Sequence, residues 1–146
     1  MKKADLLSTL FVGIDVSSRE TVVCFLDFQS QKPLLTFSVP NNQPGASEMA
    51  DKIVAFMSQH HDLSHVTVAL ESTSYYGIHI DNYLSSCSRL IPFQIAVFCV
   101  NPMLIHSYKK TFVGMSKNDY VDAFVIAGFA RVGKITSSPW RGSQFL

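Results

Sequence analysis

The spacing of hydrophobic residues changes along the chain. In its first part, three short apolar runs rich in β-branched and aromatic residues are separated by polar turns. This pattern predicts an antiparallel meander of three strands. The expected strands cover residues 10–16, 21–27 and 34–39.

From Gly45 onward the apolar residues follow a helical period. A stripe at positions 49, 53, 56 and 57 predicts a helix over residues 45–60, with Ser47 as its N-cap. Strand-like and helix-like segments then alternate, and the run at 93–100 is continuously apolar, as in a strand buried on both faces. The remaining expected elements are a strand at 66–71, a helix at 76–88, a short helix from Pro102 and a last helix at 118–131.

This order of elements, β-β-β-α-β-α-β-α-α, predicts an α/β fold. Three antiparallel strands followed by alternating helices and parallel strands make a mixed five-stranded sheet with helices on both faces. A length of 146 residues suits a single domain, with its core at about residues 10–132. The content of 47% hydrophobic and 16% charged residues favours such a sheet, because its central strands are buried.

Composition also bears on where the protein works. No apolar run reaches the roughly 18 residues that a membrane span needs. The opening residues resemble a signal peptide, but Asp5 interrupts them and no small-residue cleavage site follows, so a strand is the better interpretation. The chain has three cysteines, an odd number, and they show no C-x-x-C spacing and lie in apolar surroundings. Such cysteines indicate a protein of a reducing compartment. We therefore expect a cytoplasmic protein with no membrane partner.

Four acids occupy positions at which their side chains could meet. Asp15 ends the first predicted strand and Glu71 the fourth, and parallel neighbours in such a sheet bring their ends to one edge. Asp119 and Asp122 lie three apart on the last helix, which places their Cβ atoms roughly 5–6 Å apart on one face. Several carboxylates at one edge suit Mg²⁺, which takes oxygen ligands. Taken singly, Asp15 could be a turn former of the hairpin and Glu71 an acid favoured at a helix N-terminus, and the aspartate pair could be a capped, exposed first turn.

Charge is distributed unevenly along the chain. Residues 1–108 carry six Lys or Arg against nine Asp or Glu, whereas residues 109–146 carry six against two, giving net charges of −3 and +4. The two acids of the basic segment are Asp119 and Asp122. Basic residues around a carboxylate pair are typical of a metal site that faces a polyanion, although a solvated surface has the same composition. The candidate nucleic-acid-binding residues are Lys109, Lys110, Lys117 and Arg131.

Four ordered motifs carry a family resemblance. The stretches "FVGIDVSSRETVVC", "VALESTSYYG", "VNP" and "KNDYVDAFVIA" resemble the N-terminal domain of DEDD transposases of the insertion-sequence 110 type. These are relatives of the RuvC-like Holliday-junction resolvases within the RNase H-like fold. The resemblance implies that Asp15, Glu71, Asp119 and Asp122 are the catalytic acids and bind Mg²⁺ or Mn²⁺, as two ions. It implies a metal-dependent enzyme that contributes to DNA strand cleavage and exchange.

The same resemblance implies partners that lie beyond this chain. The family pairs this domain with a C-terminal domain bearing a nucleophilic serine, and it works with a structured guide RNA on DNA. Residues 133–146 would begin the linker to that absent domain, so we expect the chain alone to be inactive in full strand exchange. We also expect a homo-oligomer of the full-length protein, in the cytoplasm of a bacterial or archaeal cell.

Two other functions remain open from the sequence. The stretch "GIDVSS" resembles the first phosphate loop of actin-like or sugar-kinase ATPases. Such loops favour glycine after the aspartate, because the backbone must approach phosphate, and here Val16 and two serines follow. The chain could also be a binding module without catalysis that positions nucleic acid through its basic C-terminal segment.

Overall fold

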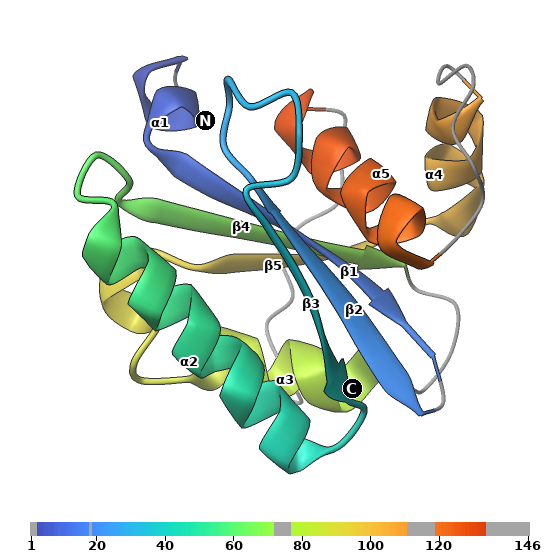
Figure 1. Cartoon of the computed structure of the whole chain (residues 1–146), viewed down its shortest axis with the longest axis horizontal. Coiled ribbons are helices and arrows are strands. Elements are labelled where there is room, and N and C mark those ends of the chain that lie inside the picture. The colour runs from blue at the N-terminus through green and yellow to red at the C-terminus, as the bar shows by residue number, and fades with distance from the viewer. Residues whose placement is uncertain (1–2, 18, 72–76, 111–118, 134–146) are drawn as a thin grey trace.

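A mixed five-stranded sheet forms the centre of the molecule, shown in Figure 1. In this computed structural model the described residues are 3–17, 19–71, 77–110 and 119–133, with residues 3, 4 and 119–121 described by their backbone alone. The strand order is β3-β2-β1-β4-β5. The strands are β1 (Thr9–Val16), β2 (Glu20–Leu26), β3 (Leu35–Pro40), β4 (His65–Glu71) and β5 (Ala96–Val100).

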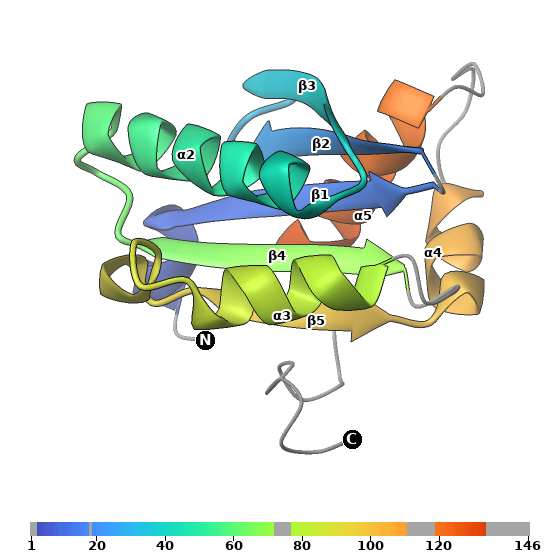
Figure 2. The same cartoon turned by 90° about the horizontal axis from the view of Figure 1, so that it is seen from below.

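The pairing of the strands confirms the predicted topology. Strand β2 pairs antiparallel with both β1 and β3, whereas β4 pairs parallel with both β1 and β5. The first strand is therefore central, and the ends of β1, β4 and β5 point to the same edge of the sheet, as Figure 2 shows. That edge is where the two strand-end acids were expected to meet.

Helices cover both faces of the sheet. Helices α2 and α3 lie on one face and α5 on the other, while α4 stands beside the edge at which the parallel strands end (Figures 1 and 2). A short helix that the sequence did not predict, α1, precedes β1. The helices are α1 (Lys3–Leu7), α2 (Gln43–Gln59), α3 (Ile78–Ser86), α4 (Pro102–Lys109) and α5 (Asp119–Arg131).

Alternation along β1 divides the interior into two cores. Leu10, Val12 and Ile14 belong to the core beneath α2 and α3, whereas Phe11 belongs to the core beneath α5. Successive side chains of a strand point to opposite faces, so Gly13 and Asp15 follow Phe11 toward α5. None of the helices in the described part of the chain combines the length and the hydrophobicity that a membrane span requires.

The start of α2 differs from the expectation. The helix begins at Gln43 and its N-cap is Asn42, whose side chain accepts a hydrogen bond of 2.8 Å from the Gly45 amide. Backbone amides in the first turn of a helix have no hydrogen-bond acceptor within the helix. Pro44, which has no amide hydrogen, therefore fits in that turn without loss of a hydrogen bond. The prediction that the helix begins at Gly45, with Ser47 as its N-cap, is therefore wrong.

The run at 93–100 is also not one buried strand. Residues Ile91–Phe93 form a 3₁₀ turn, and Gln94 has a left-handed backbone with φ of 51°, so β5 begins only at Ala96. The strand lies at the edge of the sheet, and three of its five residues are only partly buried. A continuous apolar run does not distinguish a central strand from a turn followed by an edge strand.

Candidate metal centre

Asp15 and Glu71 lie at the same edge and on the same face of the sheet. Ile14 and Leu70 are paired in the parallel ladder between β1 and β4, and each acid is the next residue of its strand. Ala69 belongs to the core beneath α5, so the alternation of side chains also directs Glu71 toward α5. Both acids are partly buried. The prediction that the two strands are neighbours is confirmed.

Close packing of α5 on β1 brings the last helix to this edge. A Cβ atom at Gly13 would lie 2.2 Å from the carbonyl oxygen of Ala123 and 2.4 Å from the amide nitrogen of Ala127, so only glycine allows the two backbones to approach so closely. Asp122 directly precedes Ala123, and Asp15 is two residues beyond Gly13. The contact therefore fixes the first turn of α5 beside the end of β1.

The sequence interpretation missed this role of Gly13. A signal was present, since a glycine inside a strand often marks a site where another backbone approaches closely. Gly13 and Asp15 also share one strand face, so the helix that needs the glycine also covers the acid.

A lysine from α4 completes the group of charges. The ammonium of Lys109 forms an ion pair with Oδ1 of Asp122, and their side chains are 30% and 38% exposed. Burial raises the pKa of Glu71 above its ordinary value, the charge of Asp122 raises it further, and the charge of Lys109 lowers it. Glu71, Asp122 and Lys109 are therefore close enough to act on one another electrostatically.

The structure describes the side chains of three of the four expected acids. Asp15 and Glu71 share an edge, and Asp122 interacts with Glu71. Asp119 begins α5, but its side chain lies outside the described residues. Within the described part of the chain, no three His, Cys, Asp or Glu side chains are close enough together to hold a metal ion. The four-carboxylate set therefore stays a prediction.

The residues at this edge carry donor atoms of the kind that suit a hard divalent cation. Their donor atoms are carboxylate oxygens, which Mg²⁺ and Mn²⁺ prefer. The mutual repulsion of Asp122 and Glu71 is one cause of the raised pKa of Glu71, and a cation between them would relieve it. Asp122 already binds one positive charge, the ammonium of Lys109, so a cation is stabilised at this position of the edge.

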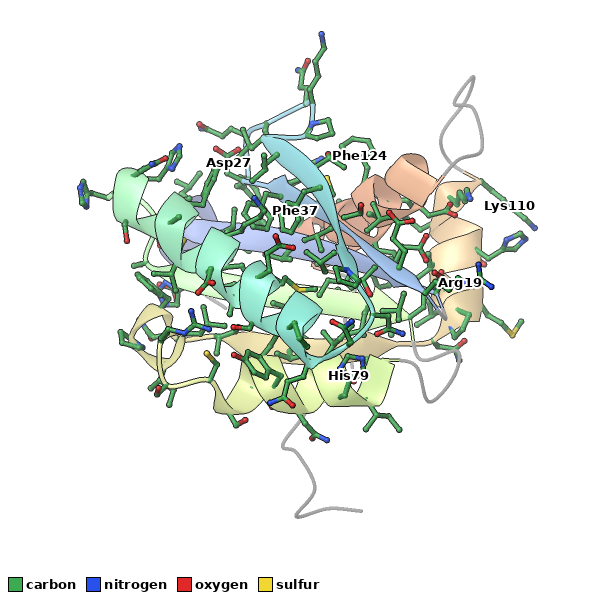
Figure 3. All side chains as sticks on the ribbon, turned by 60° about the horizontal axis from the view of Figure 1, so that its bottom comes forward. Arg19, Asp27, Phe37, His79, Lys110 and Phe124 are labelled. Atoms are coloured by element: carbon green, nitrogen blue, oxygen red, sulfur yellow. The ribbon has the colours of Figure 1, made fainter. Side chains whose placement is uncertain are left out.

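The other candidate nucleic-acid contacts are separated by the fold. Lys110 follows Lys109 at the end of α4 and extends away from the molecule, as Figure 3 shows. The guanidinium of Arg131 instead donates hydrogen bonds to the backbone carbonyls of Asp27, at 3.3 Å, and of Ser30. Asp27 and Lys110 lie on opposite sides of the molecule in Figure 3. Arg131 is thus not brought to the acids, and Lys117 lies outside the described residues.

Comparison with known proteins identifies the family of the chain. The model of the DEDD transposases of the insertion-sequence 110 type, described as a transposase, matches residues 12–146. The pilin gene-inverting proteins of Moraxella lacunata and Moraxella bovis are each 28% identical over 123 residues, which is 84% of this chain and 34% of each relative. The chain thus spans about one third of the length of these relatives.

Comparison with solved structures shows the fold. Thermus thermophilus RuvC in complex with a Holliday junction substrate gives a TM-score of 0.57 at 12% identity, covering 90% of this chain and 99% of that one. A second structure of Thermus thermophilus RuvC gives 0.56 at 11% identity, with the same coverage. The fold is therefore RNase H-like, of the RuvC-like kind, as the motifs implied. Since the family model extends over nearly the whole sequence, the chain belongs to the DEDD transposases of the insertion-sequence 110 type.

Proposed function

We propose that this chain is the metal-dependent DNA-processing domain of a transposase or site-specific recombinase. The observation that carries the proposal is that Asp15 and Glu71 end neighbouring parallel strands on the face of the sheet beneath α5, where the charge of Asp122, on α5, acts on Glu71. Asp119 opens the same helix, one turn before Asp122. An acidic edge of this kind, on a RuvC-like fold in a transposase family, supports divalent-metal-assisted cleavage of DNA.

In the proposed site each element of the fold has a separate task. The sheet holds Asp15 and Glu71 in register, and α5 supplies Asp122 together with Asp119. These carboxylates would hold two Mg²⁺ or Mn²⁺ ions. Such a pair supplies activation of the attacking oxygen and stabilisation of the leaving oxygen in phosphodiester cleavage. Partial burial of the acids limits their hydration, which strengthens their interaction with cations.

Lysines beside the acids would bind the nucleic-acid backbone. Lys109 and Lys110 end α4 next to this edge, and ammonium groups near the acids would contact phosphates of the same DNA segment. The Arg131 guanidinium already donates hydrogen bonds to backbone carbonyls of the β2–β3 turn. Arg131 also lies nine residues beyond Asp122 along α5, which is about 13.5 Å at 1.5 Å per residue. We therefore assign Lys109 and Lys110, rather than Arg131, to DNA contacts near the proposed site.

The complete reaction would involve parts outside this chain. The relatives, which are pilin gene-inverting proteins, are about three times as long as the matched region. We propose that a C-terminal domain bearing a serine, a structured guide RNA and a homo-oligomer take part in strand exchange. On this proposal the 146-residue chain binds metal and DNA but does not complete strand exchange alone.

Titration calorimetry with Mn²⁺ tests the proposal. We expect the chain to bind Mn²⁺, Asp15→Ala to abolish binding, and Asp122→Asn to weaken it strongly, because each removes a ligand. Glu48→Gln is the matched control, since Glu48 is an exposed acid of α2, on the other face of the sheet. An unsubstituted chain that binds no divalent ion, or that binds it equally well with Asp15→Ala, would contradict the proposal.

A second candidate function is nucleic-acid binding without catalysis. The Lys109–Asp122 ion pair favours it, because the lysine neutralises one of the acids without any metal. The two functions separate in the longer protein that carries this domain. If Asp119→Asn and Asp122→Asn leave recombination intact, the acids are structural and the binding module is the better description.

A further inference from the structure

The Lys109–Asp122 ion pair joins two helices, α4 and α5, that also contact each other through aromatic side chains. Asn101 caps α4 by accepting a hydrogen bond of 2.8 Å from the Met103 amide. The Tyr108 ring packs edge-on against Phe129 of α5, with 5.7 Å between ring centroids. Because the Tyr108–Phe129 contact holds the two helices together, the ion pair can open by movement of the lysine side chain alone, without disturbing the fold.

The position of the ammonium conflicts with a divalent ion at the same acids. Lys109 pairs with Asp122, and its charge lowers the pKa of Glu71, so its ammonium acts on two of the candidate ligands. A divalent ion held by those oxygens would lie close to the ammonium, and like charges at such distances repel each other. The lysine side chain is a flexible four-carbon stem that ends in a strongly hydrated charge, so it can swing away at small cost.

We propose that Lys109 is a built-in counter-ion that holds Asp122 before metal binds, is displaced by the divalent ion, and is then free to contact a DNA phosphate. This inference rests on the proposed function, because it concerns the same acids. It adds that metal binding and phosphate binding are coupled through one side chain. The lysine offsets the charge of Asp122 in the metal-free protein and moves to the substrate when the metal takes its place at that carboxylate.

Calorimetry with Mn²⁺ on the Lys109→Gln variant tests the competition. Removing a competing cation should tighten Mn²⁺ binding about two- to fivefold, which corresponds to about 0.4–1 kcal/mol. That range is typical of a partly exposed ion pair. The control is Lys32→Gln, which removes the same charge from an exposed residue of the β2–β3 turn. Thermal unfolding of both variants checks that they are folded.

Lysine acetylation of the unsubstituted chain tests the displacement without any substitution. We expect Mg²⁺ to increase the labelling of Lys109, read by mass spectrometry, because the ammonium leaves its carboxylate partner. Labelling of Lys32 should stay constant. Because no residue is changed, this measurement does not depend on how a variant folds.

The outcomes separate this inference from the proposed function. Tighter Mn²⁺ binding by Lys109→Gln and increased labelling of Lys109 support it. If the unsubstituted chain binds Mn²⁺ and Asp122→Asn weakens binding, yet Lys109→Gln binds no tighter than Lys32→Gln, the inference is wrong and the proposed function stands. Constant labelling of Lys109 on metal binding also overturns it. An unsubstituted chain that binds no divalent ion overturns both.

Discussion

Replacing Gly13 by alanine should disturb both the stability of the chain and its proposed metal site. The added Cβ would lie 2.2 Å from the Ala123 carbonyl oxygen and 2.8 Å from the Cβ of Ala127. The two nearest atoms belong to the backbone of α5, so no side-chain rotation relieves the contact. The helix must move away from β1 by about 1 Å to restore an ordinary van der Waals distance.

The structure sets the size of the expected effect. Overpacking of a well-filled core costs about 1–3 kcal/mol, and we expect the upper half of that range because the obstacle is backbone. For a chain of this length each kcal/mol lowers the melting temperature by about 2–4 °C. Asp122 moves together with α5, and Mg²⁺ and Mn²⁺ sites tolerate little error in the position of a ligand. The Mn²⁺ affinity should therefore fall along with the free energy of unfolding.

The assays are chemical unfolding, for the free energy of unfolding, and Mn²⁺ calorimetry on the folded variant. Gly128→Ala is the matched control within α5. There the new Cβ would lie 3.1 Å from the Tyr108 hydroxyl, at the far end of a side chain, and the helix gains propensity from alanine. We expect Gly128→Ala to be about neutral. A Gly13→Ala variant as stable as the unsubstituted chain, with equal Mn²⁺ affinity, would refute the account of how α5 is positioned.

Three further predictions concern buried and surface charges. Burial raises the pKa of Asp81 to about 6; the unfolded chain titrates near 3.8, so the folded state loses stability as pH rises from about 4 to 7. Asp81→Asn should remove that loss, worth up to about 3 kcal/mol at pH 7.5, as urea unfolding at several pH values would show. Arg131→Gln should lower the free energy of unfolding by about 1–3 kcal/mol but change DNA affinity little, whereas Lys110→Gln should leave stability unchanged and reduce the salt dependence of DNA binding by about one ion. Because the pKa of Glu71 is raised, Mn²⁺ affinity should begin to fall at a higher pH than for an ordinary carboxylate, which calorimetry at decreasing pH measures.

The sequence predicted the sheet well because its signals were local. Alternating or continuous apolar runs bounded by turns located β1, β2 and β4 to within about a residue or two of their observed ends. The expectations that failed depended on context. Pro44 and Gly45 are helix breakers in general but occupy the first turn of α2, where Asn42 caps them. The start of β5 is set by the left-handed backbone at Gln94, which no apolar pattern reveals.

The candidate site could be predicted in part. Strand ends and helical spacing were enough to select the acids, because topology rules bring parallel strand ends to one edge. The partner of Asp122 could not be found in this way, since Lys109 lies thirteen residues away on another helix. The structural task of Arg131 was hidden for the same reason, because its carbonyl partners lie about a hundred residues earlier in the chain. Long-range side-chain pairs leave no periodic signal in a sequence.

The measurement that tests the central claim most directly is a crystal structure of the chain grown with Mn²⁺, read by anomalous scattering at the manganese edge. The account predicts anomalous peaks between Asp15, Glu71 and Asp122, with Asp119 among the ligands. It also predicts that the Lys109 ammonium no longer contacts Asp122. Manganese bound only elsewhere, or none at this edge while the Lys109–Asp122 pair persists at saturating Mn²⁺, would contradict it.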